Sequence, residues 1–141
     1  TVPFGKARIV RAGTDVTNVG FSQTVQKADI AADRLAAKGI SAEVIDPRTL
    51  VPLDVDAIVA SVQKTGRPLV VDEDYLNFGM TGEISALIAE RLDEIKLRAP
   101  IRRLGVAGVS IPYSPALEKV VIPQVEHVIE AAERLVTSRV L

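Results

Sequence analysis

Acidic side chains end two apolar runs of the sequence that have the character of β-strands, and clustered carboxylates could bind a divalent metal ion. Asp46 ends the run AEVID, and Asp72-Glu73-Asp74 ends the run PLVVDED. Ligands of parallel sheets collect at the carboxyl ends of strands, where carboxylates suit Mg²⁺. A Mg²⁺-binding, receiver-like module would use this arrangement. We favour acids that cap loops or meet arginines, because no acid pair near the first strand and no lysine after a late strand complete such a site.

Other residue types that carry chemistry are scarce. The chain has no cysteine, and its one histidine, His127, falls on the polar face of an expected helix. This placement favours an exposed side chain over a catalytic base, and a zinc site would lack its ligands. The run GMTGE (79–83) puts two glycines at a helix start, where backbone amides can bind a phosphate, but the glycine-rich nucleotide motifs are missing. We expect Gly79 and Gly82 to allow close packing of the helix on a strand instead.

A rigid loop with the sequence DPRTLVPLD, residues 46–54, joins a strand-like run to a helix-like run, and we call it the elbow. Two prolines fix backbone angles in it, and an aspartate at its end can cap the following helix. Its defining residues are Asp46, Pro47, Arg48, Pro52 and Asp54. We expect Arg48 to fix the loop by pairing with a carboxylate, Asp46 or Asp72, and direct contact with a partner is the alternative.

The segments that position these residues alternate between strands and helices. Helices are expected over residues 22–38, 55–65 and 79–95, after Ser114-Pro115, and from Pro123 onward. Strands are expected over 41–46, 67–74 and 99–106, with a hairpin of two short strands within 7–21. Alternating strands and helices imply a largely parallel sheet covered on both faces. We predict an α/β fold, a three-layer α/β/α sandwich with a mostly parallel, about five-stranded sheet, in one domain over residues 1–141.

The composition excludes several classes of function. The chain has 141 residues, 48% hydrophobic and 25% charged, and a net charge of -1. That charge argues against a nucleic-acid surface, and no apolar run is long enough to span a membrane. The absence of cysteine and of a visible targeting segment suits the cytoplasm. Because the sequence begins with Thr1, we expect a fragment of a longer chain.

Several motifs, in order and over essentially the whole chain, resemble one protein family. They are PFGKARIVRAGTDVT, VIDPRTLVPLDVDAIVASVQKTGRPLVVDED, FGMTGEI, LRAPIRRLG, IPYSPALE and IPQVEHVIEAAERL. Together they resemble the C-terminal domain of the transketolase superfamily. The closest resemblance is to the beta subunit of thiamine-diphosphate-dependent 2-oxoacid dehydrogenases, the group of the pyruvate, branched-chain and acetoin dehydrogenase complexes. The elbow is the most specific of these motifs.

The resemblance implies that this domain is catalytically silent alone. In the family, the N-terminal part of the beta subunit supplies a catalytic histidine, and the alpha subunit binds the diphosphate and Mg²⁺ through a Gly-Asp-Gly motif that this chain lacks. We therefore assign no catalytic, cofactor or metal residue here, and place thiamine diphosphate and Mg²⁺ in the parent enzyme. That enzyme would decarboxylate or cleave a 2-oxoacid or acetoin and transfer the acyl group to lipoyl groups. The alternatives are a transketolase or deoxyxylulose-phosphate synthase domain, or the Mg²⁺-binding receiver-like module.

The resemblance also implies partners. They are a second beta subunit, the alpha subunit and the dihydrolipoyl acyltransferase core, in the cytoplasm or, in a eukaryote, the mitochondrial matrix. The module of the core that binds this subunit is small and basic, so acids and the terminal carboxylate should receive it. The candidates are Glu118, Glu126, Glu130, Glu133 and Leu141. Arg98 stands where relatives often have an acid before Ala-Pro, and it weakens the docking prediction.

Overall fold

A five-stranded sheet forms the centre of this computed structural model, which describes residues 1–138. The strands are β1 (Arg8–Arg11), β2 (Val16–Gly20), β3 (Ala42–Asp46), β4 (Pro68–Tyr75) and β5 (Arg102–Val106). Their spatial order is β1-β3-β2-β4-β5, and all neighbours run parallel except β1, which is antiparallel to β3 at one edge. The predicted number and direction of the strands are confirmed.

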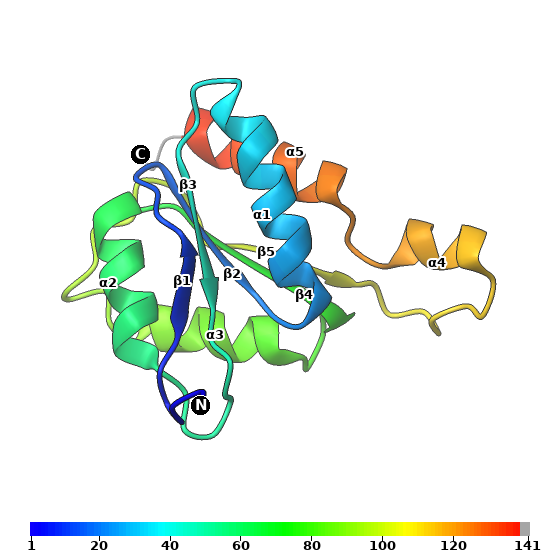
Figure 1. The fold of residues 1–141 in the computed structure, drawn as a ribbon, viewed down its shortest axis with the longest axis horizontal. Coiled ribbons are helices and arrows are strands. Elements are labelled where there is room, and N and C mark those ends of the chain that lie inside the picture. Colours follow the sequence, from blue (N-terminus) through cyan, green and yellow to red (C-terminus); the bar gives the residue numbers. More distant parts are fainter. Residues whose placement is uncertain (139–141) are drawn as a thin grey trace.

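Helices cover both faces of the sheet (Figure 1). They are α1 (Gln23–Ala36), α2 (Val55–Thr65), α3 (Met80–Ala89), α4 (Pro115–Val121) and α5 (Val125–Thr137). Helices α1 and α5 enclose one apolar core with the sheet, and α2 and α3 enclose a second core on the opposite face. The three-layer sandwich is therefore confirmed, while α4 projects away from all three layers. None of the helices described within residues 1–138 is long and apolar enough to cross a membrane.

The first two strands do not form the predicted hairpin, because β3 lies between them. The segment that links them instead crosses the start of β3. The backbone amides of Thr14 and Asp15 donate to the carbonyl of Ser41 at 3.1 and 2.8 Å. Gly13 passes so close that a Cβ there would lie 2.2 Å from the backbone nitrogen of Glu43. The turn-forming residues of this segment therefore carry the chain across β3 and do not form a hairpin. Local sequence patterns do not reveal such a crossing.

The helices begin and end close to where the sequence predicts, with one clear exception. Asp54 caps α2 as expected, since its Oδ1 accepts a hydrogen bond of 3.2 Å from the amide of Ala57. Gly66 then ends this helix in the left-handed conformation, with a φ of 68°. The exception is α3, which was expected to continue to residue 95 and ends at Ala89. The chain turns after this point, and Ile95 still packs into the core beneath α2 and α3.

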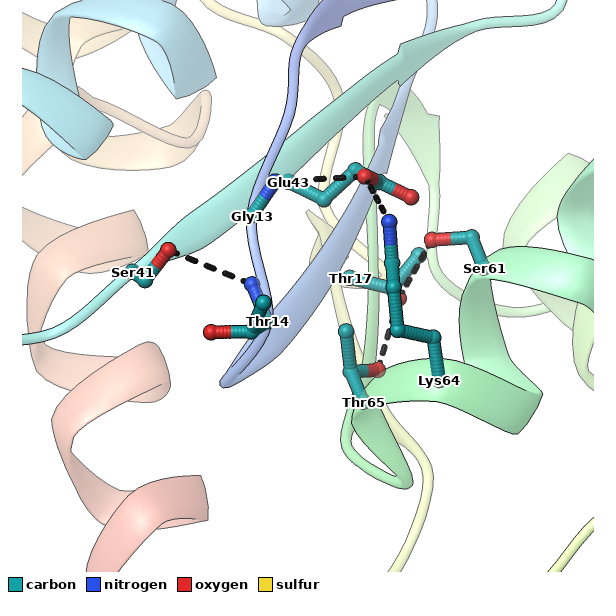
Figure 2. Close-up of polar contacts among 8 residues, drawn as sticks. All are labelled: Gly13, Thr14, Thr17, Ser41, Glu43, Ser61, Lys64 and Thr65. Carbon is teal, nitrogen blue, oxygen red and sulfur yellow. Dashed lines mark hydrogen bonds and ion pairs between the residues drawn. The ribbon is translucent and has the colours of Figure 1, made fainter.

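Buried hydroxyl groups join α2 to the central strand of the sheet (Figure 2). The Thr17 hydroxyl on β2 lies 2.7 Å from the hydroxyls of both Ser61 and Thr65 on α2. All three side chains are buried, so each would lose hydrogen bonds to water without these partners. This network fixes how α2 lies on its face of the sheet.

Glu43 forms a second polar connection to α2, through Lys64 (Figure 2). Its side chain is only 1% exposed, whereas that of Lys64 is 43% exposed. The Glu43 carboxylate also accepts a hydrogen bond of 3.2 Å from the amide of Gly13, at the crossing over β3. Burial alone would raise the pKa of Glu43, but hydrogen bonds from Lys64, Ser61 and Gly13 outweigh this effect and lower the pKa. One carboxylate thus holds together the crossing segment, β3 and α2.

Replacing Glu43 with glutamine is expected to lower the free energy of unfolding near neutral pH by about 2 kcal/mol, because the ion pair of a buried carboxylate with the half-exposed Lys64 and its hydrogen bonds are lost. A group whose pKa is lowered in the folded chain stabilises the fold above its ordinary pKa, and this effect is lost as the pH falls through the folded-state pKa. The difference in the free energy of unfolding between wild type and variant, measured with urea, should therefore become smaller at pH values below 4.5, the ordinary pKa of glutamate.

The matched control is Glu130→Gln, which removes an ion pair to Arg134 in which both side chains are more than half exposed. Its loss should change stability little at either pH, because exposed pairs contribute little. A gap between wild type and Glu43→Gln that stays the same in acid would contradict the prediction.

Asn18 is an exception to the pairing of buried polar groups in β2. It is fully buried between Val44 of β3 and Leu69 of β4. Neither its Nδ2 nor its Oδ1 has a hydrogen-bond partner among the described residues. An unpaired buried amide costs free energy that an apolar side chain of similar size would not.

The Asn18→Leu variant is therefore expected to raise the free energy of unfolding by about 1–3 kcal/mol. Thr17→Val, the neighbouring position, is the matched control and should lower it by about 1–2 kcal/mol, since two hydroxyls on α2 lose their partner. Urea unfolding of both variants measures the two changes in the free energy of unfolding, which should have opposite signs. A loss of stability in Asn18→Leu would show that the amide is satisfied, for example by buried water.

Candidate interaction surface

The elbow folds as a tied loop at the carboxyl end of β3. The hydroxyl of Thr49 donates to the carbonyl of Pro52 at 2.7 Å and accepts the amide of Gly5 at 3.0 Å. Asp54 uses its second oxygen, Oδ2, to accept the amide of Ala7 at 3.0 Å. The elbow is therefore bound to the N-terminal segment as well as to α2, which agrees with an architectural role for its short polar residues.

Arg48 does not form the predicted ion pair. Its side chain is exposed and pairs with neither Asp46, nor Asp72, nor any other acid within residues 1–138. Only its backbone amide bonds to Asp46, at 2.9 Å from Oδ1. Its φ of 62° lies in the left-handed region, which is unfavourable for a residue with a side chain. The buried Pro47 and the loop's other hydrogen bonds thus hold the elbow, and the guanidinium faces outward.

The acids considered for a metal site do not come together. Asp46 ends β3 and Asp72 lies in β4, and β2 separates these strands. Burial raises the pKa of Asp72, although hydrogen bonds from the amides of Glu73 and Asp74 oppose the effect. Within residues 1–138, no group of three or more His, Cys, Asp or Glu side chains is placed to hold a metal ion.

The two glycines before and within α3 differ in their surroundings. A Cβ on Gly79 would lie 2.0 Å from the carbonyl oxygen of Tyr75, so close packing against the end of β4 requires a glycine there. A Cβ on Gly82 would meet only the guanidinium of Arg103, at an ordinary 3.6 Å. The predicted close packing is therefore confirmed at Gly79 and wrong at Gly82.

His127 is exposed, as predicted, but it has a structural role that the sequence analysis missed. Its Nδ1 accepts a hydrogen bond of 3.0 Å from the backbone amide of Gln124, just before α5. The side chain thus satisfies an amide at the start of the helix.

Three of the four acids predicted to receive a basic partner already pair within the chain. The pairs are Glu126–Arg34 at 3.0 Å, Glu130–Arg134 at 2.5 Å, and Glu133–Lys38. A hydrogen bond from its own backbone amide and the Arg34 guanidinium lower the pKa of Glu126. Cations of α1, of the turn after it and of α5 therefore offset the negative charge of this face. Glu118, on α4, forms no ion pair among the described residues.

Arg98 lies on a different part of the molecule, in the segment before β5. Its amide donates to the carbonyl of Gly66 at 2.8 Å, and its side chain covers this glycine at the end of α2. The side chain is otherwise exposed. The remaining candidate, Leu141, lies outside the described residues.

The most exposed apolar segment, residues 107–121, was not among the predicted site residues, and we call it the arm. It includes α4, and none of its residues is buried. Figure 1 shows it extending beyond the body of the domain. Pro115 occupies the start of α4 as predicted, but the Ser114 hydroxyl makes no capping hydrogen bond. Its exposed apolar side chains are Val109, Ile111, Tyr113, Leu117 and Val120.

The exposed apolar surface continues from the arm to the loop after β4. A hollow of about 510 Å³ lies between the two, lined by Tyr75, Phe78 and Val109 among others. Phe78 is fully exposed and has a φ of 64°, so a strained backbone presents an aromatic ring to solvent. Large exposed apolar patches of this kind mark surfaces that bind another protein.

A signal for the arm was present in the sequence. The run IPYSPALEKVV carries apolar residues at irregular spacing and two prolines, which does not make a continuous buried stripe. The sequence predicts only a short helix after Ser114-Pro115, and the structure adds that the rest of residues 1–138 leaves this helix uncovered.

Comparison with known proteins identifies related chains. The family model of the transketolase C-terminal domain matches residues 5–128. The chain is 45% identical over 134 residues to the mitochondrial pyruvate dehydrogenase E1 component subunit beta of Dictyostelium discoideum, covering 95% of this chain and 37% of that protein. It is 39% identical over 135 residues to the acetoin:2,6-dichlorophenolindophenol oxidoreductase subunit beta of Bacillus subtilis, covering 96% and 39%.

A solved structure gives the same assignment of the fold. It is a split-gene transketolase, described as an inactive beta4 tetramer, with a TM-score of 0.75 and 28% identity over 99% of this chain and 44% of its own. The chain thus spans well under half the length of the relatives compared here. With the fold, the matched residues and these relatives in agreement, the chain belongs to the transketolase C-terminal domain family.

Proposed function

We propose that this chain is the assembly domain of the beta subunit of a thiamine-diphosphate-dependent 2-oxoacid or acetoin dehydrogenase, and that its arm packs against a second copy of the chain. The observation that carries the proposal is the arm, in which none of residues 107–121 is buried. The higher identity to dehydrogenase beta subunits, 45% against 28% for the split-gene transketolase, favours the dehydrogenase as parent.

The helix of the arm needs a partner for a physical reason. Helix α4 has seven residues, and isolated helices shorter than about 12–15 residues are marginal in water. Its apolar residues Leu117 and Val120 are 57% and 75% exposed, so they gain little packing energy within the chain. Burying each against a partner would contribute about 1.5–3 kcal/mol.

A second copy is the partner that the comparisons support best. The split-gene transketolase with the same fold is described as a beta4 tetramer, so beta chains of that protein associate with one another. In a two-fold dimer the same patch serves both chains, and a patch of apolar side chains is complementary to itself. Contact with an alpha subunit would then belong to other surfaces of the parent protein.

The chain does not fit a thiamine diphosphate and Mg²⁺ site. Among the described residues no cluster of His, Cys, Asp or Glu is placed to hold the metal, and the sequence lacks a Gly-Asp-Gly run. We therefore derive no catalytic step from this chain. Decarboxylation or cleavage of the substrate, and acyl transfer to lipoyl groups, belong in this proposal to the remainder of the parent enzyme.

A secondary part of the proposal concerns where a basic module of a dihydrolipoyl acyltransferase would dock on this chain. Of the four glutamates considered, Glu118 alone forms no ion pair within the described residues, and it lies on the arm beside Lys119. A basic module at α5 would have to displace Arg34, Lys38 and Arg134 from their acids. We therefore assign docking, if the core binds this domain, to Glu118 and not to α5.

The double variant Leu117→Ser/Val120→Ser is expected to weaken self-association about 100-fold or more, because each substitution removes at least about 1.5 kcal/mol of apolar burial per chain. Sedimentation velocity over a range of concentrations measures the change. The thermal midpoint of the dissociated chain should change little, since both side chains are more than half exposed within the chain.

Leu92→Ser is the matched control, because Leu92 is 48% exposed but lies in the turn after α3, away from the arm. It should leave self-association unchanged. A wild-type chain that stays monomeric at all concentrations, or a control that weakens association as much as the double variant, would refute the proposal.

A further inference from the structure

A second hollow lies at the carboxyl end of β3, on the elbow and apart from the arm. It has a volume of about 690 Å³, within the range of small-molecule sites. The N-terminal segment, the elbow and the residue before α1 line it together. Its polar side chains are Arg8, Ser22, Asp46, Arg48 and Thr49.

The charges of this hollow are unbalanced. Arg8 and Arg48 are both exposed, and neither forms an ion pair with an acid among residues 1–138. Asp46 is the one carboxylate that lines the hollow, and its Oδ1 already accepts the amide of Arg48. Four other arginines, by contrast, meet acids within the chain. Asp46 lies opposite Arg8 in the β1–β3 pairing, so two arginines and one aspartate leave the hollow with a net positive charge for an anion from outside.

The elbow holds Arg48 in place before any ligand arrives. Thr49 bonds both to Pro52 and to Gly5, so the residue that follows Arg48 is fixed on two sides. The left-handed backbone at Arg48 costs about 1–3 kcal/mol for a residue that is not glycine. The other residues of the elbow maintain this conformation, although the exposed Arg48 guanidinium makes no hydrogen bond or ion pair within the described residues. A backbone fixed in advance reduces the entropy lost when Arg48 binds a ligand, although its side chain is still free to rotate.

The start of α1 adds a favourable field to the same hollow. Ser22 precedes the helix with a φ of 51°, and its hydroxyl makes no capping hydrogen bond. The first turn of α1 contains no acidic residue to neutralise the helix dipole. The partial positive charge of this helix end therefore adds to that of the two arginines.

We propose that this hollow binds an oxyanion, the carboxylate or phosphate group of a small ligand, between Arg8 and Arg48. Guanidinium groups recognise both anions through paired N–H donors, and the hydroxyls of Ser22 and Thr49 line the same space. The inference is independent of self-association, because no residue of the arm lines this hollow.

The test is a titration of the 141-residue chain with inorganic phosphate and, separately, with acetate, followed by ¹H–¹⁵N NMR at constant ionic strength held by chloride. The proposal expects saturable shifts of the amides of the elbow and the start of α1 with one or both probes. Which probe binds more tightly distinguishes a phosphate site from a carboxylate site. Shifts that do not saturate, or that chloride alone reproduces, would overturn it.

Arg48→Gln is expected to weaken probe binding about tenfold or more, since one charge-assisted pair of hydrogen bonds is lost. Arg8→Gln should have a similar effect, and it keeps the test decisive if the elbow variant does not fold, because Arg8 lies outside the elbow. Arg134→Gln is the matched control, an exposed arginine on α5 that does not line this hollow. Equal affinity in all three variants and the wild type would exclude the site.

Discussion

Every residue of β2 is buried, so a polar side chain on this strand either finds a partner inside the chain or is left unpaired, as Asn18 is among the described residues. The strand lies between β3 and β4 in the sheet and beneath helices on both faces. Thr17 finds its partners on α2, which is why two hydroxyls of that helix point at the sheet. The position of α2 then determines where the elbow begins and ends. The burial of β2 thus influences, through the hydrogen bonds of Thr17 to α2, the position of the elbow that carries Arg48.

Residues with strained backbone conformations and exposed side chains lie at the carboxyl ends of the parallel strands. The non-glycine residues with positive φ are Ser22, Arg48 and Phe78, and each follows one of the parallel strands β2, β3 and β4. At the opposite edge, Glu43 accepts hydrogen bonds from the crossing segment and from Lys64. The polar contacts of this opposite edge stabilise the fold, whereas the carboxyl edge carries strained residues that the two proposals assign to contacts beyond the chain.

The sequence predicted most helices and strands because hydrophobic periodicity, glycines and caps are local signals. Asp54 and Gly66 delimit α2 for this reason. Pairing between distant segments has no such signal: β1 joins β3 and not its neighbour in sequence. The acids of α5 were visible, but Arg34 of α1 and Lys38 in the turn after it, which pair with two of them, lie about 90 residues away in the chain. Arg48 was expected to pair with Asp46 or Asp72, and only its surroundings in the structure show that no acid within residues 1–138 receives it.

The exposed arm has a consequence for the amounts of subunits in a cell. A short helix with an apolar face, reached through an unburied segment, is the kind of substrate that proteases and chaperones select. In the proposed dimer the second copy covers this segment, whereas a chain without a partner displays it. Degradation would then remove unassembled chains first, so the proposed contact surface would also mark the chains that have not assembled.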